Sequence, residues 1–201
     1  MEVIFHRRNT IEQLVNTDTS YGIEVDIRSY NSNLIIHHDP FSDGVLFEQW
    51  LAHFNHGTLI LNVKEEGLES KLIDLMSAHK ISNYFFLDQS FPFLIKWSKA
   101  GESNCAIRFS EYESLETALA LSGSINWVWV DCFKKFPLTI DVYKQLKNAN
   151  FKLCVVSPEL QGRNDEIEIF NMAKIINKNN MEIDAVCTKY PDLWSMAMVG
   201  K

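Results

Sequence analysis

Short apolar runs alternate with longer amphipathic segments along this chain. The apolar runs, rich in β-branched and aromatic residues, predict buried strands. They lie at residues 3–6, 22–28, 59–64, 84–88, 106–110, 127–131, 153–157 and 184–188. Between them, apolar residues at helical spacing predict helices. These are expected at residues 11–17, 47–54, 68–80, 92–101, 114–123, 139–150 and 165–179.

The regular alternation of strand and helix indicates an α/β fold. Strands that are apolar almost throughout are typical of a parallel sheet that is buried on both faces. Eight such units favour a closed (β/α)₈ barrel of the TIM type over an open sheet. The run LIIHH at residues 34–38 predicts an extra short strand in the second βα loop. No linker divides the chain, so we expect one domain over residues 1–201.

Composition narrows the class of protein. The net charge of -7 disfavours nucleic acid and anionic membranes as general partners. No stretch approaches the ~20 apolar residues of a membrane span and no signal peptide is evident, which predicts a cytoplasmic protein without stable membrane insertion. The four cysteines show no CxxC spacing and fall in or beside apolar runs, so buried free thiols are expected. Nothing in the pattern indicates an oligomeric state.

Candidate chemistry gathers at strand ends. Glu24 and Asp26 are two residues apart in an apolar strand, so both carboxylates point to the same side and can share one cation. Functional residues of barrels lie at the carboxyl ends of the strands. Further polar residues at these ends are His6, His38, Asp39, Asn62, Lys64, Asp88, Arg108, Asp131 and Lys189. For Asp88 and Lys189, simple solvation is the preferred interpretation. Arg108 is expected to point into the barrel, either paired with a carboxylate or in contact with substrate.

The order of these motifs resembles the glycerophosphodiester phosphodiesterase family of phospholipase-C-like phosphodiesterases. The matching segments are His6-Arg7-Arg8-Asn9-Thr10, Glu24-x-Asp26, His38-Asp39, Asn62-x-Lys64, Ser90-Phe91 and Thr188-Lys189-Tyr190-Pro191-Asp192. The resemblance covers the whole chain. It implies a small phosphodiester as substrate, one divalent cation on Glu24, Asp26 and Asn62, and a place in lipid metabolism.

Three positions depart from the family pattern. Arg8 replaces a glycine, Asn62 replaces the third metal carboxylate, and Lys189 replaces an acidic residue. With a neutral Asn62, two carboxylates balance a divalent cation. Carboxylate and amide oxygens are hard ligands, which favours Mg²⁺ or Ca²⁺ over zinc.

The resemblance implies His6 and His38 as the acid–base pair, with attack by a substrate hydroxyl to give a cyclic phosphate. Histidine suits this role because its ordinary pKa is near ~6.5. His37 competes with His38, but it points to the opposite side of the strand and is expected to pack or to face solvent.

Cationic side chains could hold the phosphate group. Lys64 shares a strand face with Asn62 and can reach a phosphate oxygen, and Arg7 or Arg8 could bind phosphate from the first loop.

Aromatic residues near the strand ends have two possible uses. Phe41, Phe47 and Trp50 could cover the site from the second loop, and Tyr190 and Trp194 from the last. Core packing is the preferred use of Phe47 and Trp50.

Three functions remain open at this point. The leading hypothesis is a metal-dependent phosphodiesterase, the first rival is a lyase that stops at the cyclic product, and the second is a barrel that binds a phosphorylated ligand without turnover.

Overall fold

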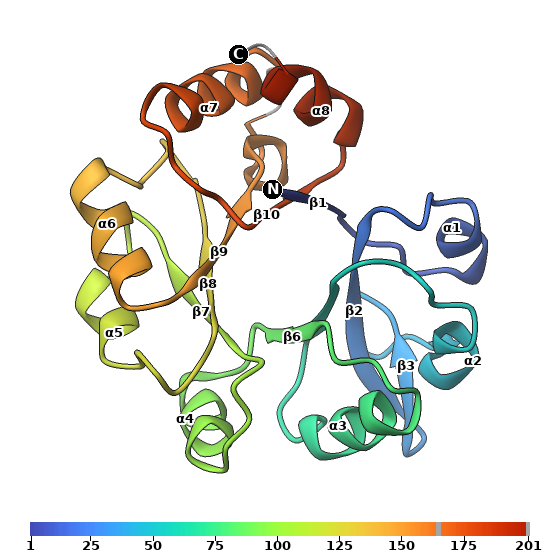
Figure 1. Ribbon diagram of the computed structural model, residues 1–201. Helices are drawn as coiled ribbons and strands as arrows, with labels where there is room; N and C mark the ends of the chain where they lie inside the picture. The colour runs from blue at the N-terminus through green and yellow to red at the C-terminus, as the bar shows by residue number, and fades with distance from the viewer. Residues whose placement is uncertain (164–165, 200–201) are drawn as a thin grey trace.

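The computed structural model describes residues 1–163 and 166–199 and shows a mixed α/β fold. Its strands curl into a ring that the helices surround (Figure 1). The strands of the ring are β1 (Glu2–Phe5), β2 (Gly22–Tyr30), β5 (Leu59–Val63), β6 (Tyr84–Leu87), β7 (Ala106–Phe109), β8 (Trp127–Val130), β9 (Lys152–Val156) and β10 (Ala185–Thr188). All eight strands predicted from the apolar runs are present.

The pairing between these strands is parallel. It runs from β7 through β8, β9, β10, β1, β2 and β5 to β6. Between β6 and β7 the ring has one isolated parallel bridge, from Phe86 to Cys105, beside a hydrogen bond from the Phe86 N–H to the Asn104 carbonyl (2.8 Å). The prediction of a closed (β/α)₈ barrel of parallel strands is therefore confirmed in part: the strands curl as in a TIM barrel, and one isolated bridge joins β6 and β7 in place of a paired ladder.

The sheet is mixed, however, and not strictly parallel. Strand β2 continues past the barrel to Tyr30, and the chain then turns through Asn31 and Ser32, both with positive φ, into β3 (Asn33–Ile36). The short strand β4 (Val45–Leu46) pairs with β3, and both contacts of β3 are antiparallel. The second loop thus adds a small antiparallel ribbon where a single extra strand was predicted.

The helices on the outside of the barrel match the seven predicted amphipathic segments in order, except for α8. They are α1 (Ile11–Val15), α2 (Phe47–Leu51), α3 (Glu69–Ala78), α4 (Phe91–Lys99), α5 (Leu115–Leu119), α6 (Ile140–Asn148), α7 (Glu166–Lys178) and α8 (Pro191–Val199), with a 3₁₀ turn, η1 (Pro158–Gln161). The predicted start of the seventh helix at Asp165 lies outside the described residues. Side-chain oxygens of Thr10, Ser114 and Thr139 cap α1, α5 and α6.

Helix α8 was not predicted. Its segment has proline at the first position, which suits a helix start, but its apolar residues do not form a clear stripe. Trp194 lies in this helix, fully buried, and its Nε1–H donates to the Ser157 hydroxyl at 2.7 Å. The expectation that Trp194 covers the site from a loop is therefore wrong.

The core has two layers. Alternate residues of the strands fill the inside of the barrel, among them Ile60, Phe85 and Trp127. The residues between them pack outward against the helices and form the larger cluster. Phe47 and Trp50 are fully buried there, as predicted. The four cysteines are buried free thiols, which confirms that prediction as well.

Candidate active site

Charged side chains line a cavity of about 140 Å³ at the carboxyl ends of the barrel strands. Its lining includes His6, Arg7, Glu24, Asn62, Lys64, Asp88, Arg108 and Asp131. We call this cavity the barrel mouth. It is smaller than the roughly 300–1,000 Å³ of a typical small-molecule pocket, so it has room for a phosphate group but not for a large substrate.

Glu24 and Asp26 form the acidic floor of the mouth, and both are fully buried. The Arg7 main-chain N–H donates to Glu24 Oε2 at 2.8 Å, and Asn62 Nδ2 donates to Glu24 Oε1 at 2.8 Å. Burial, together with the neighbouring negative charge of Asp26, raises the pKa of Glu24 to about 7. Parallel pairing of β2 with β5 puts Asp26 directly opposite Asn62. The structure therefore brings together the three residues predicted to bind metal.

Two cations contact the carboxylate of Asp26. Lys64 Nζ lies 3.1 Å from Asp26 Oδ1, and Arg7 Nε lies 3.3 Å from Asp26 Oδ2. Asn9 Nδ2 also donates to Oδ2, at 2.9 Å. Arg7 has a φ of 54°, a left-handed backbone conformation that residues other than glycine, Asn and Asp adopt infrequently. In this conformation its main-chain N–H reaches Glu24 while its side chain reaches Asp26, so Arg7 holds both carboxylates.

His6 follows β1, and its Nε2 lies 3.9 Å from Glu24 Oε2. Its side chain is only 14% exposed. Burial, reinforced by the positive charges of Arg7 and Lys189, lowers the pKa of His6 to about 3. The imidazole is therefore neutral at neutral pH and can accept a proton. Its Nδ1 is buried without a hydrogen-bond partner.

Arg108 resolves one alternative left open by the sequence. It points into the barrel and is paired with carboxylates on both sides. Its Nε and one terminal nitrogen contact Asp88 Oδ1 at 2.8 and 2.5 Å, and its other terminal nitrogen is bonded to Asp131. Asp88 also lies 3.4 Å from Lys64 Nζ, so the expectation that Asp88 is merely solvated is wrong.

Asp131 is fully buried at the end of β8. Trp129 Nε1 donates to its Oδ1 at 3.2 Å, and Gln161 Nε2 donates to the same oxygen at 2.6 Å. Burial raises the pKa of Asp131 to about 6, although the Arg108 charge opposes this shift. Sequence reasoning did not identify Gln161, which comes from the 3₁₀ turn after β9 and carries no recognisable motif.

His38 lies beside the mouth. It is about half exposed, and its Nδ1 is 2.8 Å from Asp39 Oδ1. Together with His37, it lines a second cavity of about 430 Å³ between α1 and the loop that leads to β4. Arg7 lines both cavities. The structure thus brings His6 to the metal-binding residues and puts His38 in the adjoining cavity, and both histidines of the pair His37-His38 line that cavity.

Arg8 is directed away from the barrel mouth. Its guanidinium stacks over Phe5 at 3.9 Å, and its Nε donates to Thr17 Oγ1 at 3.1 Å. Between the two arginines of the first loop, only Arg7 lines the mouth. Lys189 is exposed, and its charge contributes to the low pKa of His6.

A divalent cation fits the donor set of the mouth. Within the described residues, no three His, Cys, Asp or Glu side chains form a cation site, so a third side-chain ligand beside the two carboxylates would come from another residue type, such as the amide of Asn62. Asn62 Oδ1 is buried and has no hydrogen-bond partner, although Nδ2 of the same amide is bonded. Glu24, Asp26 and this amide oxygen are hard donors suited to Mg²⁺ or Ca²⁺. A cation there would also relieve the repulsion between the two carboxylates.

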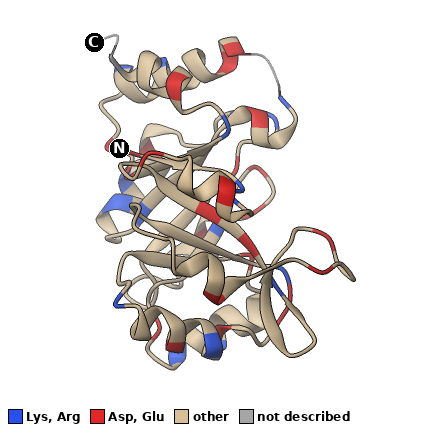
Figure 2. Ribbon diagram, turned by 90° about the vertical axis from the view of Figure 1, so that its right-hand side faces the viewer, with Lys and Arg blue, Asp and Glu red and all other residues tan. Residues whose placement is uncertain are grey.

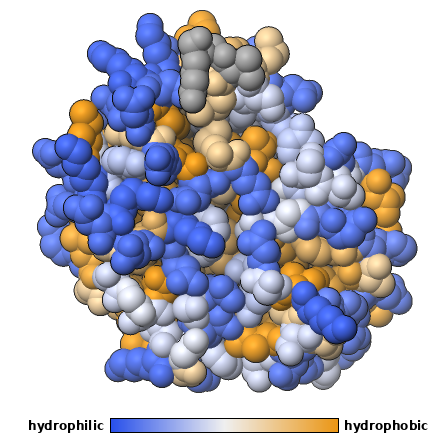
Figure 3. Space-filling view, in the orientation of Figure 1, coloured by the Kyte–Doolittle hydropathy of each residue, from blue (hydrophilic) through white to orange (hydrophobic). Residues whose placement is uncertain are grey.

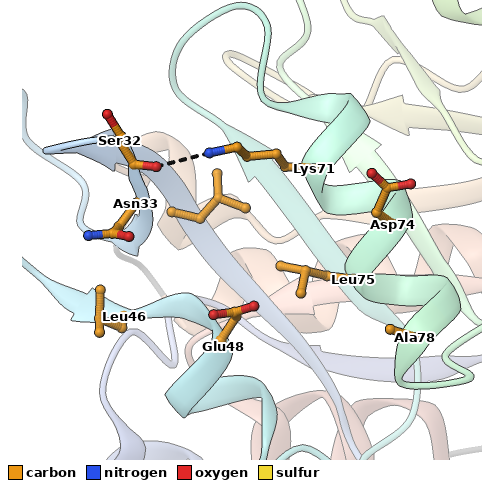
Figure 4. Close-up of a pocket in the computed structure, with 9 residues that line it drawn as sticks. Ser32, Asn33, Leu46, Glu48, Lys71, Asp74, Leu75 and Ala78 are labelled. Atoms are coloured by element: carbon orange, nitrogen blue, oxygen red, sulfur yellow. Dashed lines mark hydrogen bonds between the residues drawn. The ribbon is translucent and has the colours of Figure 1, made fainter.

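A further cavity of about 420 Å³ lies on the outer wall, away from the mouth (Figure 4). It is formed by the turn between β2 and β3, by α2 and by α3. Lys71 closes one end by donating to the Ser32 carbonyl at 2.9 Å. Leu34 and Leu75 line it, and Glu48 and Asp74 are the acidic residues at its walls. None of the residues predicted from sequence belongs to this cavity.

Comparison with solved structures supports the fold. The chain is similar to a glycerophosphodiester phosphodiesterase from Agrobacterium tumefaciens, with a TM-score of 0.71, 14% identity and 99% of each chain covered. It is also similar to a putative glycerophosphoryl diester phosphodiesterase from the same organism, with a TM-score of 0.66, 13% identity, and 98% and 97% of the two chains covered. No family model matches the sequence, and no curated protein matches it. At this identity the likeness shows the fold of these enzymes.

Proposed function

We propose that this chain is a metal-dependent phosphodiesterase that cleaves a small phosphodiester of the glycerophosphodiester type. The observation that carries this proposal is the barrel mouth, where a neutral buried histidine, two buried carboxylates and three cationic side chains line one small cavity. The shared fold with two glycerophosphodiester phosphodiesterases supports the same reaction class. We also propose a cytoplasmic location. None of the described helices is long and apolar enough to cross a membrane.

In this proposal the cationic side chains bind the phosphate group. Arg7 and Lys64 are the candidates, because both line the mouth and both contact the carboxylate of Asp26. Arg108 is already paired with Asp88 and Asp131, so its role is to position these carboxylates and to add positive charge behind the phosphate. Interactions of this kind stabilise the charge that develops on phosphate oxygens during the reaction.

In this proposal His6 and His38 transfer the protons. Neutral His6 accepts the proton of a substrate hydroxyl, whose oxygen attacks phosphorus and expels the leaving alcohol as a cyclic phosphate forms. His38, held by Asp39, donates a proton to the leaving oxygen. Water then opens the cyclic phosphate. The negative charge of a bound phosphodiester raises the low pKa of His6, because it stabilises the protonated imidazole.

Glu24, Asp26 and Asn62 would hold one Mg²⁺ or Ca²⁺. When bound, this cation supplies positive charge for the phosphate oxygens. The buried unpaired oxygen of Asn62 is the observation that supports its part in the site.

The test is turnover of a panel of glycerophosphodiesters with Mg²⁺, with Ca²⁺ and with a chelator, followed by phosphorus NMR. The proposal expects metal-dependent release of a phosphomonoester. Accumulation of a cyclic phosphate without opening would identify a lyase instead. The matched variants are His6→Ala, which removes the proposed base, and His53→Ala, which removes a histidine that lines neither cavity at the site.

A second candidate is a barrel that binds a phosphorylated ligand without cleaving it. The observation that favours it is that His38 lines a different cavity from His6, while Lys64 and Arg7 already neutralise Asp26. Binding of glycerophosphodiesters by calorimetry without turnover under any metal condition would support this candidate.

A further inference from the structure

The strands β1 and β10 end side by side, and a titratable residue follows each of them (Figure 1). Their parallel pairing puts Ile4 opposite Cys187, and both side chains belong to the core inside the barrel. Side chains alternate along a strand, so the same inner side is reached again two residues later, at His6 and Lys189. The His6 main-chain N–H donates to the Thr188 carbonyl at 2.9 Å, so the pairing continues to this point. His6 and Lys189 are therefore neighbours at the end of the barrel.

The backbone of Lys189 is held from outside the barrel. The Thr188 hydroxyl donates to Glu159 Oε1 at 2.6 Å, and the Lys189 main-chain N–H donates to the same oxygen at 2.9 Å. The other oxygen of Glu159 is bonded to the Ser157 hydroxyl, which also accepts from Trp194 of α8. Because Thr188 turns outward to this network, the side chain of Lys189 starts on the inner side. It is exposed there.

The ammonium group of Lys189 differs from the other cations at the mouth. Arg7, Lys64 and Arg108 are each paired with at least one carboxylate. Within residues 1–163 and 166–199, the ammonium of Lys189 has no hydrogen-bond or ion-pair partner. Its charge nevertheless acts on the site, because it helps to lower the pKa of His6. Lys189 thus offers a positive charge that is free to bind an anion beside the proposed base.

The protein as a whole does not attract anions. Its net charge is -7, and Figure 2 shows basic and acidic residues interspersed over the side of the molecule in view. Polar residues cover most of the end of the barrel seen in Figure 3, and apolar residues form separate spots there. An anionic group of a substrate must therefore be held by a local cation and not by the general field of the protein.

The proposed reaction decides which part of the substrate meets Lys189. The attacking hydroxyl lies at His6, whereas the leaving alcohol lies toward His38 in the adjoining cavity of about 430 Å³. Neighbouring strands are ~4.8 Å apart, so a group on the carbon next to the attacking hydroxyl comes within reach of the long Lys189 side chain. The alcohol that carries the attacking hydroxyl is thus the part of the substrate beside Lys189.

We propose that Lys189 selects phosphodiesters whose attacking alcohol carries a second anionic group, such as the carboxylate of a glycerate arm in place of glycerol. This inference rests on the proposed function for the orientation of the substrate. A compact ammonium group on a flexible stem suits an exposed carboxylate or phosphate. The acidic residue of the family pattern at this position would repel such a group, so Lys189 reverses the charge selection there.

Calorimetry with glycerol 3-phosphate and 3-phosphoglycerate in Mg²⁺ buffer tests this selection. The two probes differ in one group, a neutral CH₂OH against a carboxylate. We expect the wild type to bind 3-phosphoglycerate ~5-fold more tightly, which is the size of a good exposed ion pair. Lys189→Met should remove this preference, Lys189→Arg should keep it, and Lys189→Glu should invert it.

Lys134→Met is the matched control, because it removes the same charge from an exposed lysine at the same end of the barrel. Lys134 follows β8, its Nζ lies 5.3 Å from the Tyr112 ring, and it lines neither cavity of the site. This variant should keep the wild-type preference. Loss of Lys189 also changes the pKa of His6, but this change acts on both probes and cancels in the ratio of their affinities. Circular dichroism confirms that each variant is folded.

Equal binding of the two probes by the wild type would overturn the inference, and so would failure to bind either probe. A preference that survives in Lys189→Met would also overturn it, because the carboxylate would then bind to another group. Turnover separates this inference from the proposed function. A Lys189-dependent preference in a protein that cleaves no phosphodiester would contradict only the proposed function. Cleavage of glycerol and glycerate diesters of one neutral alcohol at equal kcat/KM would contradict only the selection by Lys189.

Discussion

Replacing Glu24 with Gln should stabilise the metal-free protein at pH 8 but not at pH 4.5. The folded protein holds the pKa of Glu24 at about 7, against 4.5 for a free glutamate, because the carboxyl is buried beside Asp26. The folded state thus binds the proton more tightly, so its stability is fully present below pH 4.5 and falls as the pH rises to 7. The difference between 4.5 and about 7, at ~1.4 kcal/mol for each pH unit, corresponds to at most about 3.5 kcal/mol.

The assay is urea unfolding of the wild type and Glu24→Gln at both pH values, with a chelator and then with Mg²⁺. With chelator, the free energy of unfolding of the variant relative to the wild type should rise by ~2 to 3 kcal/mol from pH 4.5 to pH 8. Comparing the two proteins cancels the titration of shared groups that do not interact with Glu24. With saturating Mg²⁺ the wild type should recover its stability at pH 8, because the cation binds the ionised carboxylate. A relative stability that does not change with pH would refute the reasoning about burial.

Three further predictions concern other parts of the mouth. His6→Ala should lower kcat by at least ~10²-fold, while calorimetry should show a nearly unchanged Mg²⁺ affinity. His37→Ala should lower kcat much less, and an inactive His37→Ala enzyme would contradict the assignment of acid–base catalysis to His6 and His38. Asn62→Glu should tighten Mg²⁺ binding in calorimetry because a formal charge replaces an amide dipole, and an unchanged affinity would remove Asn62 from the ligand set. Arg108→Met should cost about 2 to 4 kcal/mol in urea unfolding because it leaves the buried Asp131 unpaired, and adding Asp131→Asn should recover part of this loss.

Much of the fold could be predicted because it follows from local patterns. A barrel strand buried on both faces is apolar almost throughout, and each of the eight was visible as such a run. The alternation of side chains between the two faces of a strand also had predictive value. Glu24 and Asp26 share a face, and in the structure both are buried, Glu24 lining the mouth and Asp26 contacting Lys64 of the same mouth. Of the antiparallel ribbon, β3 was predicted but β4 was not, because β4 has only two residues and shows no alternation of apolar and polar positions.

Pairing between strands was harder to predict. Lys64, Asp88, Arg108 and Asp131 end four successive strands, β5 to β8, and contact one another in that order with alternating charge. No spacing in the sequence reveals this row, because each contact joins residues about twenty positions apart. Asp88 was misjudged for this reason: alone, a carboxylate at a strand end is ordinarily solvated, and only its two cationic neighbours give it a position in the mouth.

This row of charges bears on how the mouth would bind an anion. The ionisable groups there are the carboxylates Glu24, Asp26, Asp88 and Asp131 and the cations Arg7, Lys64 and Arg108. At pH 8, above the pKa of Glu24, carboxylates outnumber cations, and His6 is neutral. A phosphodiester anion would then meet a slightly negative cavity whose cations are already paired. A divalent cation on Glu24 and Asp26 reverses this balance and weakens the hold of Asp26 on Lys64 and Arg7, which frees both to bind phosphate. Metal binding and phosphate binding should therefore be coupled in this barrel, each strengthening the other.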